Sequence, residues 1–416
     1  METSPTRGAV FAEITRKNSL YRLVDRFYSK AAPLQPLLLF AYMAKCVLSV
    51  GPFSGADAGA VSISAFENER NAIERIAALV PNVNLLRLSL KRSHVFGRGQ
   101  LRATCRMVGL VRRMWPLLSR LARSHSFMPA ARITSAVAFY VRFVQLFAER
   151  PELAAAIVAS NYSPEAVALS AAAHREGRHV IYVNHAPVPA NSGSVPPVLA
   201  DCAAFYGGAI GHTYERRSRC TAEVVLIGQP GIAQPMKWRD DVRKIGIFLT
   251  ALTRIDTVTE LVSAIHASRP DIRILIRNHP VALLRSEFPH LAFAHKNLEI
   301  TIGKPLDDEI AACDLIFCGN SGVAMNALRG GRPVAYLDAL DGLSFDYNGF
   351  VESKLVCDTQ GWTDDLYDRL KTFYASFSWE AVMKSYDASY GIDKGPLERA
   401  AADSIRRHLS AAQVQG

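Results

Sequence analysis

The feature that most constrains the fold is a strand, a tight loop, a helix and a second strand within residues 315–338. Leu315 to Cys318 is a short apolar run typical of a buried strand. Apolar residues at helical spacing follow a four-residue turn and continue to Gly330, and Pro333 to Leu337 predicts the second strand. This unit is the building block of a parallel sheet, so an α/β fold is expected.

The turn after the first of these strands is a candidate anion site. A strand there hands over to a helix N-terminus, where free N–H groups and the helix dipole favour an anion. Small residues let a phosphate approach the backbone, and Ser321 adds a hydroxyl donor. We therefore predict a phosphate-binding loop made of Gly319, Asn320, Ser321 and Gly322. The alternative is a plain helix cap, because Asn and Ser are ordinary capping residues.

Strands and helices alternate along most of the chain, which indicates more than one α/β domain. At 416 residues, the chain is too long for a single typical core. We predict two Rossmann-like domains facing a cleft, with residues 1–235 in the first and residues 236–416 in the second. The polar stretch from Gln229 to Arg243 is the expected hinge, and the last helices are free to cross back.

His185 is a candidate catalytic base. It follows the predicted strand Val180 to Val183 and opens a loop rich in proline and glycine. Ligands of open parallel sheets bind at the carboxyl ends of the strands. An imidazole there can take a proton from an acceptor hydroxyl near neutral pH. The alternative is that His185 only hydrogen-bonds the loop backbone.

A second cluster follows the predicted strand Ile272 to Ile276. Arg277 and His279 are two residues apart at the strand end, so their side chains share a face. With Asn278 they suit a phosphate or carboxylate, and His279 can protonate a leaving phosphate. The alternative is that Arg277 and His279 are buried against the predicted helix at Asp307 to Glu309.

The charge balance points to an acidic partner, because the net charge is +10. Basic residues crowd residues 91–123 without an acidic one, and apolar residues lie between them. This segment fits a helix on an anionic membrane surface, or a solvated positive face above a core-facing stripe. It matches no nucleic-acid-binding module, so no nucleic acid partner is expected.

The remaining composition gives no sign of a metal or a secretory route. Seven cysteines are scattered without zinc spacing, which favours reduced thiols in the cytoplasm. The longest apolar run, Pro36 to Val50, contains Lys45 and is shorter than the roughly 20 residues that span a bilayer. We expect a cytoplasmic protein, with peripheral contact at the inner face of the membrane as an open alternative.

Two of these motifs together resemble a known group of enzymes. Arg277-Asn278-His279-Pro280 and the turn at 319–322 resemble the His-Pro and serine motifs of bacterial sialyltransferases and polysialyltransferases. They are also similar to motifs of Kdo transferases and of the glycerophosphotransferases of capsule and teichoic acid synthesis. His185-Ala186-Pro187 is similar to the His-Gly-x-Pro loop of the last group, with Ala for Gly and a shortened spacing. Two α/β halves resemble the GT-B architecture of glycosyltransferases.

The resemblance implies a metal-independent glycosyltransferase without a cofactor. It would move a sugar from a CMP- or CDP-linked donor to a surface polysaccharide or glycan. His279 would contact or protonate the leaving phosphate, Ser321 and nearby amides would hold it, and His185 would be the acceptor-side base. No acidic-acidic-Gly triplet, the sialyltransferase base motif, precedes residue 230, so the donor sugar stays open. Two alternatives are a CDP-alditol-dependent glycerol- or ribitol-phosphate transferase and a non-enzymatic scaffold that binds polysaccharide or membrane.

Overall fold

The computed structural model describes residues 19–51, 53, 58–90, 97–193, 195–250, 252–279, 296–301, 303–343 and 345–411. The chain forms two compact units. The N-terminal unit contains the described parts of Gly8–Ala186, Ser194–Gly228 and Asp393–Gly416, and the C-terminal unit contains Pro187–Gly193 and Gln229–Ile392. The boundary predicted from the sequence follows residue 235, whereas the long segment of the C-terminal unit begins at Gln229.

The N-terminal unit is built on a six-stranded parallel sheet with the order β2-β1-β3-β4-β5-β6. Its strands are β1 (Ala60–Ile63), β2 (Leu85–Leu88), β3 (Ala155–Val158), β4 (His179–Val183), β5 (Cys202–Phe205) and β6 (Glu223–Leu226). The helices against it are α4 (Glu67–Leu79), α7 (Pro164–Arg175), α8 (Gly208–Arg217) and α15 (Lys394–Ala411). The strand order reverses between β1 and β3, so the sheet has a switch point there.

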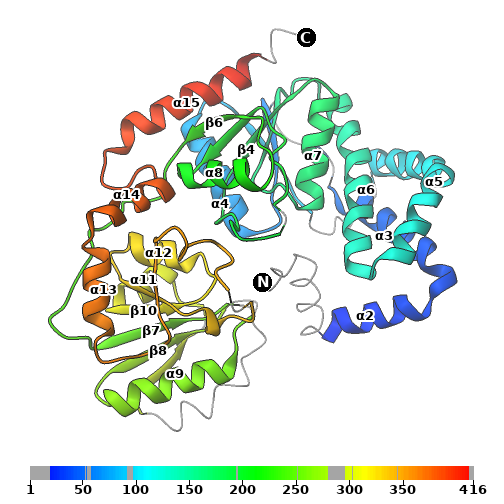
Figure 1. Ribbon diagram of the computed structural model, residues 1–416. Helices are drawn as coiled ribbons and strands as arrows, with labels where there is room; N and C mark the ends of the chain where they lie inside the picture. The colour runs from blue at the N-terminus through cyan, green and yellow to red at the C-terminus, as the bar shows by residue number, and fades with distance from the viewer. Residues whose placement is uncertain are drawn as a thin grey trace. The chain divides into compact units, whose positions relative to one another are not determined.

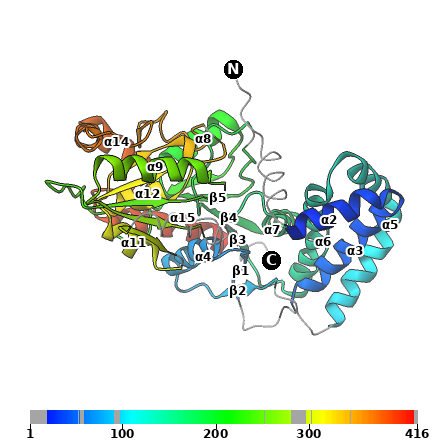
Figure 2. The ribbon, with the colours of Figure 1, turned by 90° about the horizontal axis from the view of Figure 1, so that it is seen from below.

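Four further helices form a separate layer of the N-terminal unit, here called the helical module. Its elements are α2 (Ser19–Lys30), the 3₁₀ turn η1 (Ala32–Leu34), α3 (Gln35–Ser49), α5 (Arg98–Ser124) and α6 (Phe127–Glu149). α6 packs against α7 on one side and against α3 and α5 on the other, so α5 lies farther from the sheet than α6 (Figure 2). The apolar run at Pro36 to Val50 is thus mostly helix α3, four residues of which are buried in the module: Leu39, Met43, Cys46 and Val47.

The C-terminal helix α15 belongs to the N-terminal unit. Glu223 on β6 accepts hydrogen bonds from Ser404 Oγ at 2.5 Å, from Arg407 at 2.8 Å and from His408 at 3.1 Å. α15 also contacts α4, β4 and β5. The end of the chain therefore packs on the sheet that its first half builds.

The C-terminal unit has a second six-stranded parallel sheet, with the order β12-β11-β10-β7-β8-β9. Figure 1 labels three of its strands, β10, β7 and β8. Its strands are β7 (Lys244–Phe248), β8 (Arg273–Arg277), β9 (Leu298–Thr301), β10 (Leu315–Cys318), β11 (Val334–Tyr336) and β12 (Cys357–Asp358). Its helices are α9 (Ile255–Ser268), α11 (Leu306–Ala312), α12 (Val323–Arg329), η3 (Asp338–Leu340), α13 (Leu366–Tyr374) and α14 (Phe377–Tyr386). When its strands are numbered along the chain, this sheet has the strand order of dinucleotide-binding domains. Its switch point lies between β7 and β10. The predicted α/β class with two Rossmann-like domains is confirmed.

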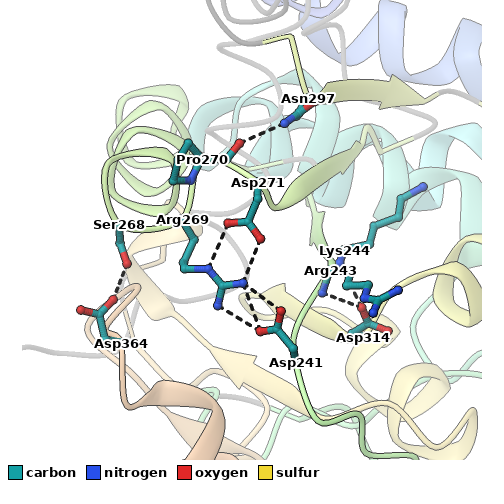
Figure 3. A network of polar contacts seen from close by, with 10 residues as sticks. All are labelled: Asp241, Arg243, Lys244, Ser268, Arg269, Pro270, Asp271, Asn297, Asp314 and Asp364. Atoms are coloured by element: carbon teal, nitrogen blue, oxygen red, sulfur yellow. Dashed lines mark hydrogen bonds and ion pairs between the residues drawn. The ribbon is translucent and has the colours of Figure 1, made fainter.

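The amino-terminal edge of this sheet is held by a network of charges (Figure 3). The buried Asp314 carboxylate accepts the backbone N–H groups of Arg243 and Lys244 at 2.9 and 3.0 Å, which fixes the start of β7 beside β10. Arg269 at the end of α9 pairs with Asp241 at 3.1 Å and with Asp271 at 3.0 Å. These groups satisfy one another, so this edge is structural and the candidate site lies at the opposite edge.

Candidate active site

The carboxyl edge of the C-terminal sheet gathers the predicted donor-side residues. β7 lies between β8 and β10, and the register sets Phe248 beside both Arg277 and Cys318. The residues that follow β8 and β10 therefore flank the end of β7, about 10 Å apart from strand spacing alone. The structure thus brings the two motifs to one edge of one sheet, on either side of its switch point.

Arg277 is engaged within the protein. Its guanidinium forms an ion pair with Glu309 on α11 and donates to the carbonyl of Lys304 at 2.8 Å. The two paired side chains are 14% and 3% exposed. This is the arrangement given as the alternative to phosphate binding, and it makes Arg277 a support for the end of β8.

Asn278 and His279 are the polar groups that β8 presents at its end. Asn278 is 4% exposed, and its Oδ1 has no hydrogen-bond partner among the described residues. His279 is half-buried, and burial together with the charge of Arg277 lowers its pKa. Its imidazole is therefore mainly neutral at pH 7, and an arriving phosphate dianion would favour its protonation. Pro280 of the His-Pro motif lies outside the described residues.

The turn after β10 uses most of its amides internally. Ser321 N–H donates to Gly319 O at 2.8 Å, Ala324 N–H to Ser321 O at 3.2 Å, and Met325 N–H to Gly322 O at 3.1 Å. Val323 N–H donates to Ser321 Oγ at 3.2 Å, as in a helix cap. The serine oxygen is thus an acceptor. Its O–H meets no acceptor in the part of the chain that the structure describes, so it can donate to a ligand. A phosphate at this loop would therefore be bound mainly by the Ser321 hydroxyl, because several of the backbone N–H groups already donate within the turn.

Asn320 shapes the rim of the site. Its Oδ1 accepts Tyr347 N–H at 2.7 Å and Tyr336 O–H at 3.0 Å, while its Nδ2 donates to Phe345 O at 2.7 Å. All polar atoms of this side chain are occupied within the protein. Asn320 therefore fixes the segment around Phe345 and Tyr347 beside the turn, a role that depends on residues distant in sequence.

Asp341 lies beside the switch point, in contact with the segments that follow β7 and β10. Its carboxylate accepts Thr250 O–H, after β7, at 3.1 Å and Leu343 N–H at 3.1 Å, and the residue is 2% exposed. A Cβ on Gly319 would lie 3.1 Å from Cβ of Asp341, so glycine allows the close approach of these segments. The hydrogen bond from Thr250 to Asp341 thus joins the end of β7 to the segment that follows β11 and η3.

The segment that follows His185 packs on the C-terminal unit. Asn191 donates its backbone N–H to Tyr347 O at 3.1 Å and its Nδ2 to Asp346 O at 2.8 Å. The ring of Pro187 lies 3.4 Å from the position of a Cβ on Gly322. Residues 187–193 therefore cover the turn after β10, which the spacing of motifs in the sequence does not show.

The hydrogen bonding of His185 fixes the tautomer that a general base requires. Its Nδ1 is hydrogen-bonded to the carbonyl of Ala159, just after β3. A carbonyl only accepts, so Nδ1 carries the proton and Nε2 keeps its lone pair. Burial lowers the pKa of this half-buried imidazole, although the bond to Ala159 opposes the shift. Nε2 has no partner among the described residues and can take a proton.

Two buried carboxyl groups near the switch point of the N-terminal sheet were not predicted. Glu69 on α4 accepts Ala65 N–H at 2.8 Å, and its Oε1 has no partner among the described residues. Glu165, in the first turn of α7, is 6% exposed. Burial raises the pKa of both carboxyls, and the charge of Glu69 adds to the shift of Glu165. Each glutamate alone has the sequence signature of a helix start, so their proximity could not be read from spacing.

A cavity of about 520 Å³ opens at the carboxyl ends of β1 and β2. Phe66 at its edge is 63% exposed, and Ser64 and Ser89 line it. Its two arginines are matched by carboxylates, since Arg70 contacts Glu67 at 3.1 Å and Arg87 forms a bidentate pair with Glu74. An uncharged, hydroxyl-rich ligand suits such a compensated lining better than an anion does.

Comparisons with known proteins concern the fold alone. No protein-family model and no curated protein matches the sequence. Among solved structures, the chain is similar to the GtfA/B complex with 13% identity and a TM-score of 0.39, covering 66% of this chain and 61% of that one. It is similar to the glycotransferase of kitacinnamycin with 14% identity and a TM-score of 0.45, covering 84% and 98%. It is similar to UDP-GlcNAc 2-epimerase from Neisseria meningitidis with 12% identity and a TM-score of 0.47, covering 85% and 99%.

Proposed function

We propose that this chain is a glycosyltransferase that moves a sugar from a nucleotide-activated donor to a glycan or surface polysaccharide. The observation that carries the proposal is the carboxyl edge of the C-terminal sheet. There a buried amide oxygen of Asn278, the imidazole of His279 and the hydroxyl of Ser321 flank the switch point of a dinucleotide-type sheet. A cytidine-linked donor is proposed from the likeness of the two motifs to sialyltransferase-type enzymes.

The donor side would work by stabilising a leaving phosphate. The bond between the anomeric carbon and the phosphate oxygen breaks, and the electron pair stays on that oxygen. Ser321 O–H donates to the phosphate, and His279 donates as a neutral or newly protonated imidazole. Arg277 acts on this site through the position of β8, because its guanidinium is held by Glu309.

The acceptor side would activate a sugar hydroxyl. The acceptor oxygen forms the new bond to the anomeric carbon, and its proton passes to Nε2 of His185. The hydrogen bond to Ala159 fixes the tautomer that this step requires. The cavity beside Phe66 suits a hydroxyl-rich acceptor.

A nucleotide panel tests the proposal. CMP or CDP should raise the melting temperature of the full chain more than UDP or GDP does. Ligand at a hundredfold excess over Kd stabilises a protein by about 2.7 kcal/mol, which is readily measured. No shift with any of the four nucleotides would overturn the proposal and favour the scaffold alternative.

A glycerol- or ribitol-phosphate transferase is the second candidate. It is favoured by the motif His185-Ala186-Pro187, whose proline packs at Gly322 beside the proposed phosphate site. Such an enzyme would pass a phosphoalditol rather than a sugar. The product separates the two, because this reaction leaves a phosphodiester and sugar transfer leaves a glycosidic bond.

A further inference from the structure

The outer face of α5 carries a regular apolar stripe. Leu101, Val108 and Trp115 are 50%, 52% and 43% exposed. They recur every seven residues, so they lie on one face of the helix. Other residues of α5, namely Ala103, Met107, Leu118 and Leu121, are buried and pack into the helical module. Single exposed apolar residues are normal on a soluble protein. Here, however, three of them follow one another at intervals of two helical turns along one face, so they form a continuous apolar stripe.

The same helix carries seven arginines and no acidic residue. Arg112 lies within the apolar stripe, because it follows Val108 by four residues and precedes Trp115 by three. The other six arginines of α5 are also exposed: Arg98, Arg102, Arg106, Arg113, Arg120 and Arg123. Within the described residues none of the seven forms a salt bridge, so their charge is available to an outside anion.

A second element of the module repeats this composition. Leu23 and Phe27 on α2 are 66% and 63% exposed and four residues apart, with Arg22 and Arg26 beside them. Leu34 at the end of η1 and Leu37 in the first turn of α3 are 54% and 53% exposed. The window Ala32–Ser49 is apolar enough to cross a membrane by length and composition, yet only 22% of it is buried. The module thus exposes apolar and cationic groups together.

We propose that the helical module binds an anionic membrane surface through α5 and α2. Arginines would contact lipid phosphates, and Leu101, Val108, Trp115 and Phe27 would enter the boundary between headgroups and acyl chains. Trp favours that boundary because its ring is apolar and its N–H is polar. An acidic polymer would match the arginines equally well, but it gives no reason for the apolar stripe. The inference is independent of the proposed glycosyl transfer.

Vesicle co-sedimentation of the full chain tests this inference. Binding should occur with phosphatidylcholine vesicles that contain phosphatidylglycerol, be weak with phosphatidylcholine alone, and fall as salt rises. Arg112→Gln with Arg113→Gln should weaken binding about 25-fold, at about fivefold for each arginine. The matched control is Arg216→Gln with Arg217→Gln on α8, which removes the same charge from exposed positions of the same unit and should keep binding.

A second pair of variants tests the apolar stripe. Leu101→Ser with Val108→Ser should weaken binding even at low salt, while Leu199→Ser, at a position 56% exposed in the same unit, should not. All four substituted sets are at exposed positions, so their melting temperatures should stay near that of the parent. No binding to phosphatidylglycerol vesicles would overturn the inference. Salt-dependent binding that ignores Leu101 and Val108 would also overturn it and indicate a polyanion site.

Discussion

Replacing His185 with Gln removes a proton acceptor while keeping a side chain that can still hydrogen-bond. His185 Nδ1 is tied to Ala159 O, so only Nε2 can take the acceptor proton. A base of this kind contributes about 10²- to 10⁴-fold to a rate, or about 2.7 to 5.4 kcal/mol of barrier. We expect His185→Gln to lower kcat by that factor. His212→Gln, at a side chain 75% exposed in the same unit, is the matched control.

The pH profile sharpens the same prediction. With an ordinary pKa of 6.5, an imidazole is already about three quarters neutral at pH 7. Burial lowers the pKa of His185, so the free enzyme should lose activity only below pH 6.5. The assay measures the nucleotide released by sugar transfer or by donor hydrolysis at pH values from 5 to 8, and it gives kcat/KM at each pH. Near-parent activity in His185→Gln, or an acid limb with its midpoint above 6.5, would refute the assigned role.

Two further substitutions test the buried charges. Arg277→Gln should destabilise the C-terminal unit by about 3 to 5 kcal/mol in urea unfolding, because it leaves Glu309 buried without its partner. Under conditions where the variant is folded, its affinity for nucleotide should change little. A large loss of affinity would instead mean that Arg277 contacts the ligand. Glu165→Gln should raise the melting temperature at pH 7 to 8, since burial raises the pKa of Glu165. A raised carboxyl pKa costs stability as pH rises through the ordinary value of 4.5, so the gain should vanish below that pH, and a lower melting temperature at pH 8 would contradict the sign.

Local patterns in the sequence predicted most strands. Leu315–Cys318 forms β10 with the predicted bounds, because an apolar run there is followed directly by a glycine turn. The apolar spacing of the sequence also predicts a helix at Phe66 to Leu79 and a core helix at Ile133 to Ala148. The first is α4 (Glu67–Leu79), and the second lies within α6. Such elements are fixed by nearest neighbours, and burial of both faces of a parallel sheet gives them a plain apolar signal.

Contacts between distant residues could not be predicted in the same way. Asn320 reads as a capping residue, yet its side chain is bound to residues 345–347. Glu69 and Glu165 meet only because β1 and β3 are neighbours in the sheet. The helix α8 was missed because Gly208 and Gly211 interrupt its helical pattern. The contacts of Asn320 and the proximity of the two glutamates depend on how distant segments meet in the fold, which periodicity does not encode.

A crystal structure of the full chain with CMP tests the central claim most directly. We predict a phosphate over the end of β7, within hydrogen-bond reach, about 3 Å, of the His279 imidazole and the Ser321 hydroxyl. The base and ribose would lie along the same carboxyl edge of the sheet. A nucleotide bound at another edge, or a folded protein that takes up no CMP at saturating concentration, would contradict the account.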